Sequence, residues 1–359
     1  MHTKLILTGK KFFIVCLSII VFLLIIICGL NIIVDPYFHY HAPLDNYGYR
    51  FYHDRERYIN DGILKHYEYN ALIIGNSMVQ NFKTSEFDEI FGVNSIKTAF
   101  PGASFKEVDQ NVRTALKYNK NCKTIIRCID DNKLLDNKDS MSYPTYPTYL
   151  YDNNIFNDFK YLLNKDILKN SINILNDLLS KKNPTTSFDD YGYWNDYFTF
   201  GVDAILKEYD RPLKSDIEYN LTEKDVLTIT ETINQNVIET AKNYPDVNFY
   251  LFITPYSIIY WDTLNQRGLL NKQIQAQKLA IEIMLECPNI KLFSFFEKTD
   301  IICNLNNYKD PGHYSAEINS LMLQYMKNNT YLLTKNNYQD YINNISTFFN
   351  NYNYDSIFE

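Results

Sequence analysis

The sequence predicts an α/β fold of three layers, α/β/α, with a mainly parallel, doubly wound sheet and one N-terminal transmembrane helix. Three observations predict it. Short apolar runs of strand length alternate with segments of helical spacing from residue 71 onward, and this order is typical of parallel sheets covered by helices. Polar or glycine-containing turns follow several of these runs. A longer apolar run without charges precedes the whole pattern.

The N-terminal run, residues 12–34, is long enough to cross a bilayer, for which about 20 apolar residues suffice. Three lysines precede it, and no small-residue cleavage site follows. We therefore expect an uncleaved signal anchor, with a cleaved signal peptide as the alternative. The positive-inside tendency places the N-terminus in the cytoplasm and the remaining chain outside the cell membrane.

The alternation of apolar runs and helical segments sets the expected boundaries. We expect a cytoplasmic tip and anchor at 1–35, a juxtamembrane segment at 36–70, an α/β domain at 71–330 with an insertion at 132–221, and a tail at 331–359. Strands are predicted at 71–74, 95–100, 124–129, 249–253 and 290–293. Helices are predicted at 55–65, 84–91, 104–118, 159–179, 222–243, 264–285 and 315–327, and a peripheral helix in the tail.

Composition narrows the class of partner. The formal net charge of −7 argues against a nucleic-acid partner, because phosphate contacts need a basic surface. The 31 Tyr and 23 Phe are spread along the whole chain rather than clustered. This distribution favours a general bias of the composition, rather than a sugar-stacking surface, as the reason for the high aromatic content. Outside the anchor run four cysteines remain, and they allow three disulfide pairings or none. None forms a C-x-x-C pair, so we expect buried thiols and no zinc site.

The histidines are distributed unevenly. Of the six in the chain, only His313 lies beyond the first predicted strand. It follows Asp310 by three residues in a Pro-Gly loop, and a tight turn at that spacing can bring the carboxylate against one ring nitrogen. The alternative is a surface turn capped by the aspartate. The early histidines, 39, 41, 53 and 66, lack metal-site spacing, and we interpret them as membrane-interface residues.

A serine follows the first predicted strand. Ser77 lies in a Gly75-Asn76-Ser77 turn just beyond the carboxyl end of this strand. Open α/β sheets bind their ligands at the carboxyl ends of parallel strands. A serine hydroxyl needs a base within hydrogen-bonding reach, and the loop of His313 can return to the same edge of the sheet. The alternative is an ordinary helix N-cap, a position that serine favours.

Three blocks resemble the SGNH/GDSL hydrolase superfamily: Gly75-Asn76-Ser77, Pro101-Gly102-Ala103-Ser104 and Asp310-x-x-His313, in that order. The anchor, the Asp-x-x-His-Tyr-Ser ending and an Ile-Thr-Pro-Tyr-Ser segment are similar to exported SGNH-like proteins that act beside membrane-bound O-acyltransferases. These include D-alanyl-lipoteichoic acid biosynthesis protein D and the alginate acetyltransferases. The resemblance covers about residues 72–327 without the insertion.

The resemblance implies roles for single residues. Ser77 would be the nucleophile, His313 the general base and Asp310 its orienting partner, with the backbone N–H groups of Ser77 and Gly102 as oxyanion donors. Gly102 could instead be a simple turn glycine. The third block departs from the family's Gly-x-Asn-Asp, because the strand here ends in Asp130-Asp131-Asn132. Asn132 is the candidate for the missing oxyanion donor.

Three further residues are candidate substrate contacts: Asn76, Tyr256 and Trp194. Trp194 lies near Tyr191 and Tyr193 in the insertion, and this group either lines a sugar-binding cleft or fills a small core. The motifs call for neither a metal nor an organic cofactor.

The expected function is O-acyl transfer outside the cell, through an acyl-Ser77 intermediate. The expected partners are a membrane-bound O-acyltransferase, a cell-envelope polysaccharide or teichoic acid, and the membrane. Two alternatives remain. One is a membrane-anchored carbohydrate esterase, a deacetylase, that uses the same residues with water as acceptor. The other is a non-catalytic glycan-binding partner of a membrane acyltransferase.

Overall fold

A computed structural model describes residues 9–51, 55–143 and 146–359, which form two compact units. The anchor unit comprises 9–51, 57–67 and 146–186. The sheet unit comprises 55–56, 68–143 and 187–359. The expected insertion at 132–221 is therefore divided, because its middle part packs with the anchor rather than with the sheet.

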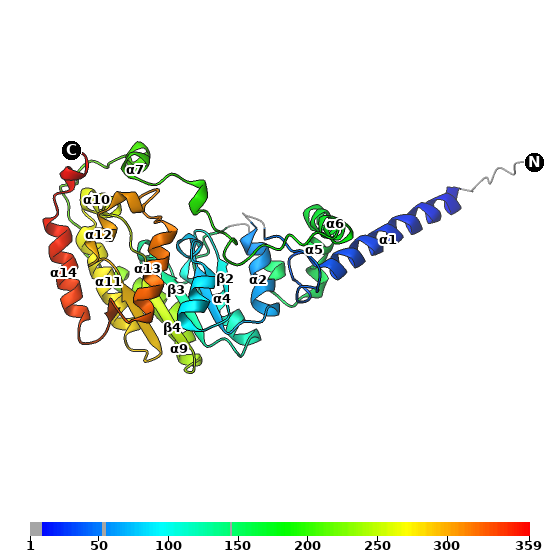
Figure 1. Cartoon of the computed structure of the whole chain (residues 1–359), viewed down its shortest axis with the longest axis horizontal. Helices are drawn as coiled ribbons and strands as arrows, with labels where there is room; N and C mark the ends of the chain where they lie inside the picture. Colours follow the sequence, from blue (N-terminus) through cyan, green and yellow to red (C-terminus); the bar gives the residue numbers. More distant parts are fainter. Residues whose placement is uncertain (1–8, 52–54, 144–145) are drawn as a thin grey trace, which may run out of the picture. The chain divides into compact units, whose positions relative to one another are not determined.

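The sheet unit contains a six-stranded sheet in the order β2-β1-β3-β4-β5-β6. Three of its strands, β2, β3 and β4, are labelled in Figure 1. Neighbouring strands from β2 to β5 are parallel, and β6 is antiparallel to β5. The strands are β1 (Ala71–Gly75), β2 (Ser95–Ala99), β3 (Thr124–Ile129), β4 (Asn248–Ile253), β5 (Ile290–Ser294) and β6 (Leu332–Leu333). The predicted mixed α/β fold with a mainly parallel sheet is confirmed.

The strand order places a switch point beside β1. The chain runs from β1 outward to β2 and then returns to β3 on the other side of β1. Crossovers on the two sides of such a point leave a crevice at the carboxyl ends of the strands, where open α/β sheets bind ligands. Every residue of β1 is buried, which agrees with the unbroken apolar run that predicted this strand.

The helices of the sheet unit form two sets by their mutual contacts. In one set α4 contacts α9, and α11 contacts α8, α10 and α14; in the other, α3 contacts α13. The helices are α3 (Thr84–Phe91), α4 (Phe105–Tyr118), α7 (Val202–Glu208), α8 (Glu223–Ile233), α9 (Glu239–Asn243), α10 (Ile258–Gln266), α11 (Leu270–Met284), α12 (Thr299–Ile302), α13 (Ala316–Lys327) and α14 (Tyr338–Asn351).

Two predicted helices are interrupted. The helix predicted at 264–285 is instead α10 and α11, which are separated at Gly268 with φ +67°. A side chain there would collide with the carbonyl oxygen of Ile217, so glycine is required by a close approach as well as by its φ. The helix predicted at 222–243 is capped by Thr222, but a π-helical turn, Asn234–Ile238, separates α8 from α9.

The helix predicted in the tail is present as α14, and one face of it packs into the core of the sheet unit. Tyr341, Ile345 and Phe349 of α14 are buried. Phe349 stacks on Trp261 with ring centroids 3.7 Å apart. These residues recur at helical spacing, so α14 presents one apolar stripe inward in spite of its polar composition.

The anchor unit is built on α1 (Gly9–Val34), which is long and apolar enough to cross a membrane, with a mean hydropathy of 3.3 over its most apolar 18 residues. α1 contacts α5 (Phe159–Leu162) and α6 (Lys165–Leu179). A single helix was predicted at 159–179, but Asn164 caps a new one, its side chain accepting a hydrogen bond from the backbone N–H of Asp166 at 2.8 Å. The helix predicted at 55–65 is α2 (Glu56–His66), which belongs to this unit from Arg57 on.

Candidate active site

Ser77 is the first residue of a tight 3-10 turn, Ser77–Val79, that directly follows β1. Asn76 is the N-cap of this turn, and its Oδ1 accepts a hydrogen bond from the backbone N–H of Met78 at 2.9 Å. The capping role considered for Ser77 is therefore filled by its neighbour. Gly75 permits the turn because a side chain there would collide with the thiol of Cys128 on β3.

Ser77, His313 and Asp310 form a continuous hydrogen-bonded chain. Ser77 Oγ lies 2.8 Å from His313 Nε2, and His313 Nδ1 lies 2.8 Å from Asp310 Oδ2. The serine and the histidine are 236 residues apart in sequence. The fold joins them because the loop before α13 returns to the carboxyl end of β1. Hydroxyl, imidazole and carboxylate in this order are the arrangement that can activate a serine as a nucleophile.

Asp310 is fixed as an ionised carboxylate. Its Oδ1 accepts hydrogen bonds from the backbone N–H groups of Gly312 and His313, and Lys309 Nζ donates to Oδ2 at 2.9 Å. Burial alone would raise the pKa of Asp310, but the hydrogen bonds and charges of His313 and Lys309 outweigh it and hold that pKa well below its usual range. An ionised Asp310 favours the proton on Nδ1 and leaves Nε2 free to accept the serine proton.

The 310–313 loop is packed against the segment that follows β4. Ser257 donates its backbone N–H and its hydroxyl to the carbonyl of Pro311, at 3.0 and 2.8 Å. Tyr256 lies so close to Gly312 that a Cβ added there would be 3.0 Å from its ring. The glycine at the third position of the Asp-Pro-Gly-His sequence suits this loop, because there is little room for a side chain there.

A cavity of about 260 Å³ opens at Ser77 and His313. Its lining includes Glu56, Ser77, Gln80, Pro101, Gly192, Trp194, Phe198, Lys309 and His313. Trp194 contacts the His313 ring edge to face, with centroids 5.6 Å apart. Lys309 Nζ lies 4.2 Å from the centroid of the Phe198 ring. A second hollow of about 540 Å³ shares Phe198 and Lys309 with it, so the two are contiguous.

Gly102 occupies a tight turn beside this cavity. The backbone N–H of Ala103 donates to the carbonyl of Phe100 at 2.8 Å, and Gly102 has φ +69°. Proline followed by such a glycine is the pattern of a type II turn, so the turn role considered for Gly102 holds. Within the described residues, the N–H groups of Gly102 and Ser77 donate to no acceptor. Both predicted oxyanion donors therefore remain free to bind one.

Asn132 does not lie where the motif placed it. Its side chain is exposed and is absent from the lining of the Ser77 cavity, while its backbone N–H donates to Asp130 Oδ1 at 3.1 Å. Asp130 itself is turned inward and buried. Asp130 does not line the Ser77 cavity, so its carboxylate is held away from the place where an oxyanion would form.

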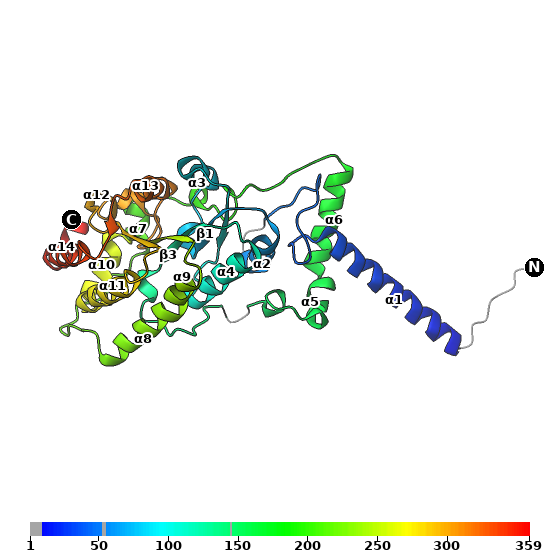
Figure 2. The same ribbon diagram turned by 90° about the horizontal axis from the view of Figure 1, so that it is seen from below.

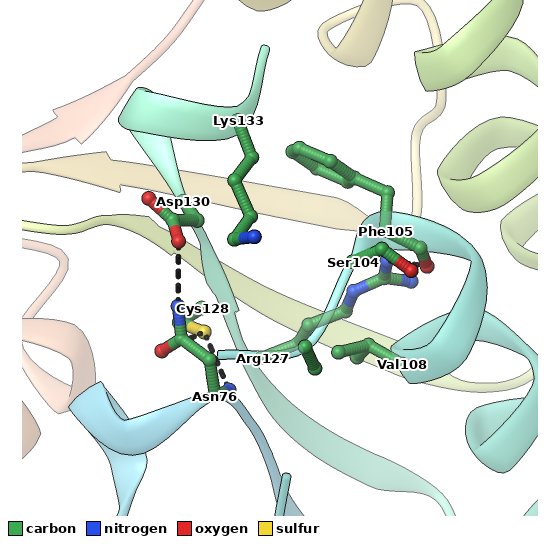
Figure 3. Close-up of a pocket in the computed structure, with 9 residues that line it drawn as sticks. Asn76, Ser104, Phe105, Val108, Arg127, Cys128, Asp130 and Lys133 are labelled. Carbon is green, nitrogen blue, oxygen red and sulfur yellow. Dashed lines mark hydrogen bonds between the residues drawn. The ribbon is translucent and has the colours of Figure 1, made fainter. Parts of the chain in front are cut away.

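Asp130 binds two of the candidate substrate contacts. Asn76 Nδ2 donates to it at 2.7 Å, as Figure 3 shows, and Tyr256 OH donates to it at 2.6 Å. Asn76 and Tyr256 are only 4% and 7% exposed, and neither lines the Ser77 cavity. The structure thus makes them supports of the Ser77 turn and the His313 loop. Trp194 lines the cavity, whereas its neighbour Tyr191 is buried.

Lys97 is a supporting residue that the sequence reasoning missed. It lies in β2, fully buried, and its Nζ donates to the carbonyl oxygens of Gln80, Phe82 and Asp189 at 2.5, 2.7 and 3.2 Å. It therefore ties the chain that follows Ser77 to the segment that leads to Trp194. A lysine inside an otherwise buried strand was the available signal. Burial lowers the pKa of Lys97 to about 7.

We expect Lys97→Met to destabilise the protein by about 2–4 kcal/mol, because the buried carbonyls of Gln80 and Phe82 and the part-buried carbonyl of Asp189 lose their donor. The folded-state pKa lies below the ordinary 10.5, so the unfolded chain binds more protons between about pH 7 and 10.5. This contribution makes wild-type stability rise with pH in that window, and the variant should lack the rise. Unfolding curves of wild type and Lys97→Met from pH 6 to 10 measure this pH dependence of stability. Lys291→Met in β5 is the control. Parallel pH profiles for wild type and Lys97→Met would refute it.

Asp131 provides a second test of buried charge. Within the described residues neither carboxylate oxygen has a hydrogen bond of good geometry, and the nearby amides of Gln273 and Gln277 offset its burial only in part. Burial raises the pKa of Asp131 to about 7. Between the ordinary value of 3.8 and about 7 the folded state binds more protons, so rising pH lowers stability there.

Asp131→Asn should remove this loss of stability at rising pH, because an amide carries no charge. We expect the variant to be more stable than wild type by roughly 2–4 kcal/mol at pH 8, and the difference to shrink toward pH 4. Thermal or urea unfolding across this range measures it. A difference that does not change with pH would contradict the assignment.

The fold and the site together define a mixed α/β protein with a Ser-His-Asp hydrogen-bonded chain beyond the carboxyl end of a parallel strand. No protein-family model matches the chain, and no curated protein matches it in sequence. In the described part of the chain, no group of three or more His, Cys, Asp or Glu residues is placed to hold a metal ion. All six cysteines are free thiols, of which Cys122, Cys128 and Cys287 are buried.

Two of the four early histidines, His39 and His41, have ordinary hydrogen-bond partners. His39 Nε2 lies 3.4 Å from Asp158 Oδ1, and the ring of His41 is hydrogen-bonded to the carbonyls of Ala42 and Ile32. His53 lies outside the described residues. The interpretation of this group as membrane-interface residues stays a prediction.

Proposed function

We propose that the protein is a membrane-anchored O-acyltransferase of the SGNH/GDSL type, which acts outside the cell through an acyl-Ser77 intermediate. The observation that carries the proposal is the hydrogen-bonded chain from Ser77 Oγ through His313 to Asp310. The three-layer arrangement of this superfamily belongs to the same proposal. It is supported by the two sets of helices, α3 with α13 and the larger set around α11.

In the first half of the reaction, Ser77 Oγ attacks the carbonyl carbon of the acyl donor while His313 Nε2 accepts its proton. The N–H groups of Ser77 and Gly102 stabilise the oxyanion that forms. The tetrahedral intermediate then collapses, its bond to the leaving group breaks, and His313 gives the proton to that group. An acyl ester on Ser77 remains.

In the second half, a hydroxyl of the acceptor replaces the leaving group. His313 Nε2 removes the proton of the acceptor hydroxyl, and the acceptor oxygen attacks the acyl carbon of the Ser77 ester. The tetrahedral intermediate collapses, the bond between the acyl carbon and Ser77 Oγ breaks, and His313 returns the proton to Ser77 Oγ as the acylated acceptor leaves. The acceptor proposed is a cell-envelope polysaccharide or teichoic acid. The aromatic wall of the cavity, Trp194 and Phe198, together with the exposed Tyr197 of the contiguous hollow, suits a sugar ring.

The acyl donor is proposed to come from a membrane-bound O-acyltransferase that delivers the group across the bilayer. α1 supports this part of the proposal, because a helix able to cross the membrane would keep the site beside such a partner. The same topology leaves the N-terminus in the cytoplasm, as the lysines before the apolar run predict.

Envelope acylation in cells separates this proposal from its alternatives. A strain that lacks the gene is complemented with wild type, with Ser77→Ala or with no gene, and the O-acyl content of its envelope glycans is measured. Acyl transfer predicts that deletion lowers acylation and that Ser77→Ala fails to restore it. Raised acylation after deletion would favour an esterase. Full restoration by Ser77→Ala would favour a non-catalytic partner.

A further inference from the structure

We propose that the anchor unit has a second membrane-contact surface, formed by residues 155–163, which include α5, and that this surface rests on the lipid headgroups beside α1. This lipid-contact surface consists of the exposed apolar side chains Ile155, Phe156, Phe159 and Leu163, with lysines around it. Its occupant is a phospholipid bilayer. The inference does not depend on the chemistry of Ser77, because it rests on the anchor unit alone.

Hydrogen bonds fix α5 and α6 to one level of α1. Asn31 of α1 is fully buried, its Nδ2 donates to the carbonyl of Leu162 at 2.8 Å, and its Oδ1 accepts from Ser171 Oγ at 2.9 Å. Tyr161 OH donates to Asp35 Oδ1 at 2.6 Å. Figure 2 shows α6 crossing the C-terminal end of α1, as these contacts require.

The position of Asn31 sets the height of this crossing. It lies three residues before Val34, the last residue of α1, and Asp35 is the first charged residue after the apolar run. At about 1.5 Å per residue, Asn31 is therefore about 5 Å below the end of the helix. When α1 spans a bilayer of ordinary thickness, α5 and α6 are held at the boundary between acyl chains and headgroups.

The side chains exposed around α5 suit the boundary between acyl chains and headgroups. Phe156 is 87% exposed, Ile155 74% and Phe159 56%, which is unusual for neighbouring large apolar residues in water. Exposed lysines follow in the same segment, at positions 160, 165, 169, 181 and 182. Apolar residues that enter the acyl boundary beside lysines at the headgroups are typical of a segment that lies in the membrane interface.

The charge of the segment favours lipid over a partner protein's helices. Two of its carboxylates are already engaged inside the anchor unit: Asp158 accepts from Tyr40 OH at 3.2 Å, and Asp177 pairs with Arg50 at 2.8 Å. The five exposed lysines outnumber the two remaining carboxylates, Asp152 and Asp166, so the segment is net basic and can meet anionic headgroups, whose attraction adds to that of the apolar side chains. Transmembrane helices of a partner offer no such layer of negative charge.

Quenching of tryptophan fluorescence by brominated lipid tests the proposal on the full chain. Phe156→Trp and, as control, Leu213→Trp are placed in nanodiscs of phosphatidylcholine and phosphatidylglycerol, with and without bromine on the acyl chains. Leu213 is 93% exposed and lies in the sheet unit. The emission of the native Trp194 and Trp261 is measured in the wild-type protein and subtracted.

We expect brominated lipid to reduce the added emission of Phe156→Trp by roughly half and to leave that of Leu213→Trp unchanged. Emission of Phe156→Trp that is quenched no more than the control would overturn the proposal. It would show that the surface does not contact lipid and is left for a protein partner. Because Phe156 is exposed, the substitution leaves the packing of α5 and α6 intact.

Discussion

Ser77→Ala should reduce the turnover of an activated ester or acyl donor by a factor of roughly 10⁴–10⁶, because the attacking oxygen is removed while the cavity remains. The fold should be unaffected, since Asn76 and not Ser77 caps the turn. Initial rates of wild type and variant at saturating donor measure the loss. Ser142→Ala, on an exposed loop, is the matched control. Wild-type rates in the Ser77 variant would show that another group is the nucleophile.

Asp310→Asn should lower kcat by roughly 10²–10⁴ with little change in KM, because an amide cannot hold the proton on His313 Nδ1 in the same way. kcat and KM measured separately test this, with the exposed Asp300→Asn as control. An unchanged kcat in Asp310→Asn would contradict the assigned role.

The same substitution has a pH signature in stability. The pKa of Asp310 is depressed in the folded state, so its contribution to stability is fully present above the ordinary value of 3.8 and is lost as pH falls below it. Asp310→Asn should therefore be destabilised at pH 7 and approach wild type in strong acid. Unfolding measurements at these two extremes check the sign. A variant as stable as wild type at pH 7 would contradict it.

The strands of the sheet were predictable because parallel strands bury both faces. β3 has the predicted bounds, and β1 extends its predicted run by one residue. β6 was missed, since two residues carry no periodicity. The break between α10 and α11 was missed as well, because what requires Gly268 is the carbonyl of Ile217 on a distant segment.

The meeting of Ser77 and His313 was predicted from the carboxyl edge of the sheet and from the scarcity of late histidines. The placement of Asn132 was not predictable, because a 3-10 turn after β3 decides which side chain faces the cavity. Lys97 was missed because its acceptors come from two segments, at 80–82 and at 189, that are separate from it in sequence. The membership of 146–186 in the anchor unit depends on contacts such as Asn31 with Leu162, 131 residues apart.

The central claim is that Ser77 carries the acyl group during the reaction. The most direct measurement incubates the full chain with activated acyl donors, quenches it in acid and maps its peptides by mass spectrometry. We predict one added acyl mass on the peptide that contains Ser77, and none on the same peptide of Ser77→Ala. No adduct on Ser77 with any of the donors, or an equal adduct in the alanine variant, would contradict the claim.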